Sequence, residues 1–108
     1  FRAAADLFAS FNQTYPGGPL AAQAELNRGE ALDKLGDTRE AARAYLASFS
    51  TDPEGPVAPQ ALYELGRSLG ALGQTQEACV TLGEVAVRFP DSPTVAQAQD
   101  QRRNIGCS

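Results

Sequence analysis

The stretch of this chain that most resembles catalytic machinery is Gly66-Arg67-Ser68-Leu69-Gly70, which matches the Gly-x-Ser-x-Gly pattern of a nucleophile elbow. Such an elbow places its serine on a sharp strand-to-helix turn, where a nearby histidine acts as the general base. This chain has no histidine, and the motif falls inside a helical pattern of apolar residues. We therefore interpret the match as coincidental and expect no enzymatic activity.

Metal, cofactor and nucleic-acid chemistry also lack the residues that they need. Without histidine the chain is missing the commonest metal ligand, and Cys79 and Cys107 are too far apart for a Cys-x-x-Cys motif. The charge balance is 13 acids against 9 bases, a net charge of -4, with no basic run to attract nucleic acid or anionic membranes. No apolar stretch approaches the ~18 residues that span a bilayer. We expect no metal, cofactor, nucleic acid or membrane insertion.

The strongest signal is a repeat, marked by proline-rich strings at 15–19, 52–56 and 89–93. Pro16, Pro53 and Pro90 are 37 residues apart (53−16 and 90−53), and a second proline follows each of them three positions later. The same step superimposes LGDT at 35–38 on LGQT at 72–75. A fixed period of tens of residues indicates stacked supersecondary units.

Each unit has the pattern of a helical hairpin. The first helix runs from the proline pair to a Leu-Gly pair, with apolar residues three or four positions apart, and the second helix ends at the next proline. The predicted fold class is therefore all-α. We expect a right-handed α-solenoid of stacked antiparallel hairpins, with about six helices and a 37-residue period.

Glycines and polar residues indicate where the helices begin and end. Gly36 and Gly73 stand where a left-handed residue ends the first helix of a unit. The expected caps of the second helices are Asp37 or Thr38, with Glu40 completing a capping box, and then Gln74 or Thr75. The last helix is expected to have Asp91 or Ser92 as its cap and Pro93 at its first position.

Gly29 and Gly66 are unusual because they fall inside the first helices, where glycine costs ~1 kcal/mol relative to alanine. Ala41 and Ala78 are expected opposite them on the second helices. Small residues on both sides would let the two axes approach closely. We therefore predict a packing role for both glycines.

The whole chain, 1–108, is predicted to form a single domain. Its expected parts are a second helix of a truncated repeat at 1–16, repeats at 17–53 and 54–90, and a capping helix at 91–108. Residues 1–11 carry an apolar face that is a candidate contact for self-association. An alternative function is therefore that of a structural or oligomerisation module.

The repeated pattern of Gly, Leu, Gly, Ala, Tyr or Leu, and Pro resembles the tetratricopeptide repeat, with three residues added to its ~34-residue period. The pattern residues are Gly29, Leu32, Gly36, Ala41, Tyr45 and Pro53, then Gly66, Leu69, Gly73, Ala78, Leu82 and Pro90. The resemblance implies a concave groove, lined by the first helices, that binds a protein partner. The groove residues that it implies are Gln23, Leu26, Asn27, Glu30, Asp33, Lys34, Gln60, Tyr63, Glu64, Arg67, Gln97, Asp100 and Asn104. Tyr63 is the expected anchor, since an aromatic ring with a polar tip suits an interface.

A narrower resemblance covers nearly the whole chain. The Phe, Ala and Tyr-Pro spacing at 1–16 and the Ala, Leu and Phe-Pro-x-Ser-Pro spacing at 78–98 are similar to the C-terminal domains of the YbgF (CpoB) family. That family implies a periplasmic, non-enzymatic scaffold of the Tol–Pal system that binds TolA, with links to a peptidoglycan synthase complex. It would help coordinate outer-membrane constriction with peptidoglycan synthesis in cell division. BamD-type outer-membrane assembly lipoproteins share the Tyr-Pro-x-Ser motif and are an alternative family.

Cys79 and Cys107 are predicted to form a disulfide. Cys79 lies one turn into a second helix, and Cys107 follows the end of the next helix, which should run antiparallel to it. Gly106 would let the chain leave helical geometry and turn back towards Cys79. An even cysteine count, and the oxidising periplasm that the resemblance implies, favour pairing. The bond would hold the polar last helix, which otherwise should fray.

Overall fold

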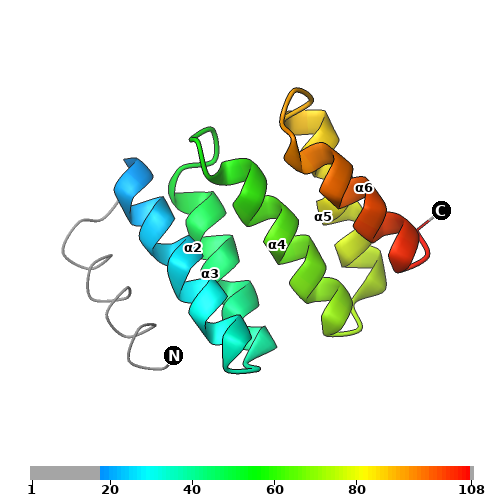
Figure 1. Ribbon diagram of the computed structural model, residues 1–108, viewed down its shortest axis with the longest axis horizontal. Helices are drawn as coiled ribbons and strands as arrows, with labels where there is room; N and C mark the ends of the chain where they lie inside the picture. The colour runs from blue at the N-terminus through cyan, green and yellow to red at the C-terminus, as the bar shows by residue number, and fades with distance from the viewer. Residues whose placement is uncertain (1–17, 108) are drawn as a thin grey trace.

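The computed structural model describes residues 18–107, and this part of the chain consists of five α-helices (Figure 1). They are α2 (Gly18–Lys34), α3 (Thr38–Thr51), α4 (Ala58–Ala71), α5 (Thr75–Arg88) and α6 (Thr94–Asn104). About six helices were expected for the whole chain. The helix expected over 1–16, and with it the apolar face of 1–11, lies outside the described residues.

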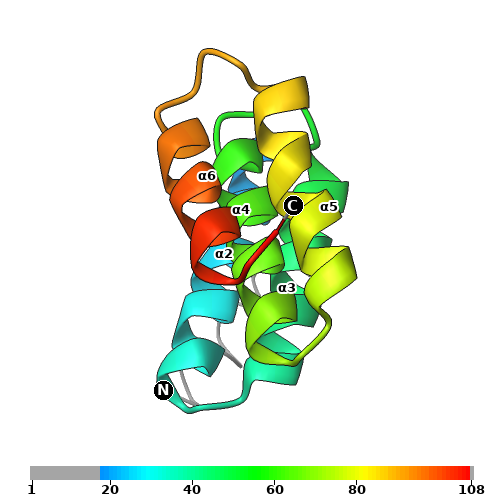
Figure 2. The same cartoon turned by 90° about the vertical axis from the view of Figure 1, so that its right-hand side faces the viewer.

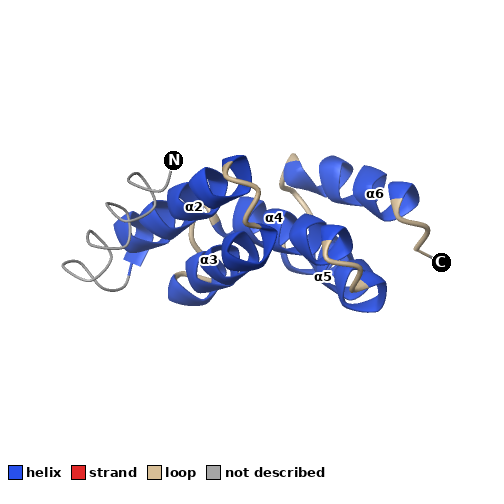
Figure 3. Ribbon diagram, turned by 90° about the horizontal axis from the view of Figure 1, so that it is seen from below, coloured by secondary structure: helices blue, strands red, loops and turns tan. Residues whose placement is uncertain are grey.

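The helices pack as sequential hairpins. Helix α2 pairs with α3 and α4 with α5, while α3 contacts α4 and α6 contacts α5 and α4 (Figure 2). Seen from below, α2, α4 and α6 lie along one side of the molecule, and α3 and α5 lie along the other (Figure 3). The all-α prediction and the hairpin pairing are confirmed.

Glycines end three of these helices in the left-handed conformation. Gly36, Gly73 and Gly106 have φ angles of 82°, 83° and 81°, which only glycine adopts without cost. The amide after each glycine donates to a carbonyl five residues earlier, as in a Schellman motif. These bonds run from Asp37 to Leu32 (3.0 Å), from Gln74 to Leu69 (2.9 Å) and from Cys107 to Arg102 (2.9 Å). The predicted stops at 36 and 73, and the turn at 106, are confirmed.

The caps agree with the sequence in part. Asp37 is the N-cap of α3, and its carboxylate accepts a hydrogen bond from the Glu40 amide at 3.4 Å. Gln74 occupies the same place before α5 but makes no side-chain cap bond. Before α6, Pro93 is itself the N-cap rather than the first helical residue, so that placement was wrong by one position. Ser92 still contributes, because its hydroxyl accepts a hydrogen bond from the Thr94 amide at 3.1 Å.

Two apolar clusters form the core. The first core cluster lies mostly between α2 and α3 and contains Leu26, Ala31, Leu32, Ala41, Ala44, Tyr45 and Ala61. The second core cluster joins α4, α5 and α6 and contains Leu62, Leu82, Val85 and Ala98. Phe49 packs against both clusters, and its ring meets Phe89 edge-on with the centroids 6.5 Å apart. The two hairpins therefore share one continuous apolar interior.

The two helix-interior glycines pack against large residues and not against alanines. A Cβ atom added at Gly29 would lie 2.5 Å from the Tyr45 ring, and one added at Gly66 would lie 2.7 Å from Leu82. Ala41 and Ala78 are not among the nearest neighbours of either position. The packing role stands, but the expected partners were wrong. Each glycine makes room for a bulky side chain of the second helix.

The Cys79–Cys107 disulfide is present, with the two Cα atoms 5.6 Å apart. It joins the first turns of α5 to the segment just after α6, so the prediction of this pair is confirmed. Closing a loop of this length stabilises the fold by about 3–4 kcal/mol in the chain-entropy account.

Replacing Gly66 by alanine tests the glycine packing. We expect Gly66→Ala to lower the free energy of unfolding by about 1–2 kcal/mol, because overpacking against fully buried Leu82 outweighs the gain in helix propensity. Gly83→Ala in α5 is the matched control, since its nearest neighbours are Arg102 atoms at 3.9 Å. It should gain about 0.5–1 kcal/mol. Urea unfolding followed by circular dichroism measures both, and equal effects would contradict this packing.

Two fully buried serines offer a second test. The Ser48 hydroxyl donates to the Ala22 carbonyl of α2 at 2.7 Å, whereas the Ser68 hydroxyl has no hydrogen-bond partner within residues 18–107. Ser48→Ala should therefore cost about 1 kcal/mol of unfolding free energy, and Ser68→Ala should be neutral or stabilise by up to about 1 kcal/mol. Thermal unfolding of the two variants checks the sign. A loss at Ser68 as large as that at Ser48 would show that Ser68 has a partner.

Candidate functional site

A groove of about 470 Å³ lies along α4 and α6. It is lined by Gln60, Tyr63, Glu64, Arg67, Gln97, Asp100, Gln101 and Asn104. Four of these come from α4 and four from α6, and in each helix they follow the spacing i, i+3, i+4, i+7 that places residues on one face. All seven groove residues predicted on these two helices line it. Gln101 was missed, although the same spacing would have identified it.

Tyr63 has one side in the groove and the other against the core. Its side chain is partly buried and packs against the second core cluster while it lines the groove. The core contact restricts the ring, so little conformational entropy is left to lose when a partner covers it. Tyr63 therefore contributes to the core and to the groove surface together.

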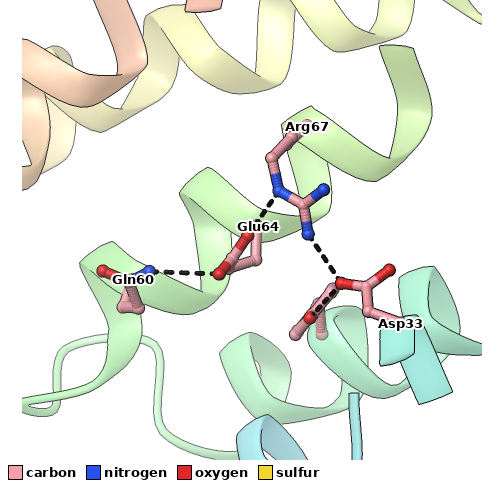
Figure 4. A network of polar contacts seen from close by, with 5 residues as sticks. Asp33, Gln60, Glu64 and Arg67 are labelled. Atoms are coloured by element: carbon pink, nitrogen blue, oxygen red, sulfur yellow. Dashed lines mark hydrogen bonds and ion pairs between the residues drawn. The ribbon is translucent and has the colours of Figure 1, made fainter. Parts of the chain in front are cut away.

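A polar network runs from the first hairpin to three groove-lining residues of α4 (Figure 4). The Tyr45 hydroxyl donates to Asp33 Oδ2 at 2.5 Å, and Arg67 Nη2 donates to the same oxygen at 2.6 Å. Arg67 Nε also donates to Glu64 Oε1 at 2.7 Å, and the Gln60 amide donates to the other oxygen of Glu64 at 3.3 Å. The network ties α2 and α3 to α4 and holds the Arg67 side chain in place.

Two members of this network, Arg67 and Tyr45, have pKa values raised above their usual ones. Burial lowers the pKa of Arg67, but the hydrogen bond and charge of Glu64, together with Asp33, outweigh burial and raise it above its usual value. Burial, followed by the hydrogen bond to Asp33, raises the pKa of Tyr45. Arg67 therefore stays charged and Tyr45 stays neutral at physiological pH. Both side chains act in this network as hydrogen-bond donors.

The predicted residues of α2 lie apart from this groove. Gln23 donates to Asn27 at 3.0 Å on the exposed face of the helix, and Glu30 and Lys34 are exposed as well. Asp33 reaches the groove indirectly, through Arg67. Leu26 is 5% exposed and belongs to the first core cluster, so the structure places it in the core rather than on the surface expected from the sequence.

Glu30 stands in a negative environment. Partial desolvation raises the pKa of its carboxyl group, the charge of Glu64 raises it further, and Lys34 opposes the shift. Asp33 adds to the increase. Acidic groups thus outweigh basic ones along this face of α2 and α4.

The structure shows the surroundings of the Gly-x-Ser-x-Gly serine and the distribution of metal-ligating side chains. Ser68 lies in the interior of α4 and is 0% exposed, so the strand-to-helix turn of a nucleophile elbow is not formed there. Across residues 18–107 no cluster of three or more His, Cys, Asp or Glu side chains could hold a metal ion. In the same range, none of the helices has the length and apolar character needed to cross a membrane.

Comparison with known proteins gives the family. The model of the tetratricopeptide repeat matches residues 26–93, more than half of the chain. The chain belongs to the tetratricopeptide repeat family, in agreement with its helical hairpins. Domains of this family are protein–protein interaction scaffolds and are typically non-catalytic. None of the curated proteins matches the chain.

The raised pKa of Glu30 predicts a pH-dependent stability effect. A carboxyl group whose folded pKa lies above its unfolded value opposes folding when ionised. Glu30→Gln should therefore raise the melting temperature by about 1–2 °C at pH 7, a small effect because the side chain is exposed. The difference should disappear as the pH falls below the pKa of Glu30. Thermal unfolding from pH 3 to 8 measures it, with Glu54→Gln in the exposed loop before α4 as the control. A difference that does not change with pH would contradict the prediction.

Proposed function

We propose that this chain is a protein-binding scaffold of the bacterial cell envelope and that it binds its partner in the groove along α4 and α6. The observation that carries this proposal is the groove itself, in which two helices present one face each around Tyr63. Aromatic side chains that combine an apolar ring with a polar tip are enriched at interfaces.

The chemistry of the groove suits an extended polypeptide. Gln60, Gln97, Gln101 and Asn104 carry amides that both donate and accept hydrogen bonds, as the main chain of a peptide requires. Arg67 is already paired with Glu64 and Asp33, so its charge is largely used within the protein. Tyr63 then supplies the apolar contact and the amides supply the hydrogen bonds.

The partner proposed is TolA, on the strength of the resemblance to the YbgF (CpoB) family. By this resemblance the protein acts in the periplasm, and its stacked hairpins form a right-handed solenoid. The scaffold helps coordinate Tol–Pal constriction of the outer membrane with peptidoglycan synthesis. The Cys79–Cys107 disulfide supports an oxidising compartment, because disulfides persist in such compartments. A BamD-type assembly protein is the alternative, and the sequence upstream in the gene would separate the two. A signal peptide followed by coiled-coil heptads supports the first, and a lipoprotein cysteine supports the second.

Titration calorimetry with the isolated domains of TolA tests the proposal. Tyr63→Ala should weaken binding about 10- to 30-fold, as expected for an aromatic residue at the centre of an interface. Asn104→Ala is a second groove variant, chosen because its side chain is exposed and its loss should leave the fold intact. It should weaken binding several-fold.

Arg43→Ala is the control, since Arg43 is exposed on α3 and does not line the groove. It should bind like the unmodified protein, and thermal unfolding confirms that each variant is folded. Unchanged affinity in both groove variants would remove the groove from the binding site. Absence of binding by the unmodified protein would exclude TolA.

A further inference from the structure

We propose that the Cys79–Cys107 disulfide is a redox switch for the groove. The bond holds α6, which forms one wall of the groove, in place, and reduction of the bond releases α6. The inference rests on the proposed function only in what the groove binds, because the release of α6 is a property of the fold. It follows from three observations, which concern the composition of the groove, the attachment of α6 and the access to the disulfide.

Helix α6 contributes four of the eight groove residues. They are Gln97, Asp100, Gln101 and Asn104, which span the helix from its first turn to its last residue. A groove with one wall missing offers a partner one helix face and no enclosure. Any process that frees α6 therefore removes the site.

The non-covalent attachment of α6 is weak. Thr94 and Ala98 are its buried residues, with Val95 and Ile105 partly buried against the second core cluster. The helix has 11 residues, and isolated helices of this length are marginal in water. One end is tied to α5 by the short 89–93 connection, and the disulfide ties the other end, next to Gln101 and Asn104. The last turn of α6 therefore depends on the disulfide.

A reductant can reach this disulfide. Both cysteines are partly exposed and line an opening of about 490 Å³ together with Thr75, Gln76, Val80, Arg102 and Gly106. Most of this lining is small or flexible, so a thiol can approach the sulfur atoms.

The reaction is thiol–disulfide exchange with the dithiol of a redox protein, because disulfides persist in an oxidising compartment until a dedicated reductant acts on them. A thiolate of the dithiol attacks one sulfur, the Cys79–Cys107 bond breaks, and the other cysteine leaves as a thiolate that takes up a proton. The second thiol of the reductant then attacks the mixed disulfide, and the remaining cysteine leaves as a thiolate that takes up a proton. The products are two cysteine thiols and the oxidised dithiol, a transfer of two electrons and two protons.

The first hairpin should not respond to this change. Its network of Tyr45, Asp33 and Arg67 joins α3 and α2 to α4 and has no member in α6. Reduction is thus expected to alter α6 and the groove while α2 and α3 keep their structure.

Hydrogen exchange of the full 108-residue chain, followed by mass spectrometry with and without dithiothreitol, tests the switch. Reduction should speed the exchange of amides in 95–104 at least tenfold and leave those of α3 within about twofold. The Cys79→Ala, Cys107→Ser double variant is the control: its α6 should exchange fast under both conditions. Equal protection of α6 in the oxidised and reduced protein would overturn the proposal.

A second experiment measures the affinity for the TolA domains in the oxidised and reduced states. The affinity for the TolA domains should fall at least tenfold in dithiothreitol and in the double variant. Unchanged affinity with a rapidly exchanging α6 would overturn the control of the groove by the disulfide. If neither redox form binds TolA while α6 is released as expected, the proposed partner fails and the switch stands.

Discussion

The rest of this structure depends on the close packing of a helix-interior glycine against a large side chain of the partner helix. At Gly29 a Cβ atom would overlap the Tyr45 ring, and at Gly66 it would overlap Leu82. Both large residues are fully buried, so the hairpin can close only where the opposing helix presents no side chain. This constraint brings Tyr45 to the place where its hydroxyl meets Asp33, and Asp33 in turn holds Arg67 of the next hairpin.

The polar network that joins the first hairpin to α4 is not repeated between α4 and α6. One period after Tyr45, Asp33 and Arg67 come Leu82, Gly70 and Asn104. Leucine fills the same cavity without a hydroxyl group, and Gly70 has no carboxylate to bridge to α6. Gly70 instead lies beside Ile105, whose side chain would be 3.6 Å from a Cβ atom added at that glycine. The last helix is therefore held by modest apolar contact and by the Cys79–Cys107 disulfide, which takes the role that the polar network has between the first two hairpins.

The two kinds of connection have different consequences for the groove. Its α4 wall includes Arg67, which is tied to Asp33 of the first hairpin by a hydrogen-bonded ion pair. Its α6 wall is joined to α5 by the Cys79–Cys107 disulfide, which lines an opening at the surface. Under the proposed switch, reduction releases the α6 wall of the groove and leaves the α4 wall in place. Each wall contributes four lining residues, so the proposed binding of a partner uses both.

The sequence by itself determined the features that depend on neighbours along the chain. The 37-residue period predicted the hairpins. Local backbone chemistry predicted the left-handed stops at Gly36 and Gly73 and a cap at Asp37 or Thr38. The groove positions on α4 and α6 were implied by the resemblance to the tetratricopeptide repeat, and their spacing places them on one face of each helix. Even the disulfide could be predicted, because consecutive helices run antiparallel and the two cysteines lay at neighbouring ends. Only the tertiary structure decided which side chain fills the space at Gly29, that Leu26 belongs to the core, and that Asp33 reaches Arg67 34 residues away. These contacts join different helices, and their geometry depends on how closely and at what angle the helices pack, which no local pattern specifies.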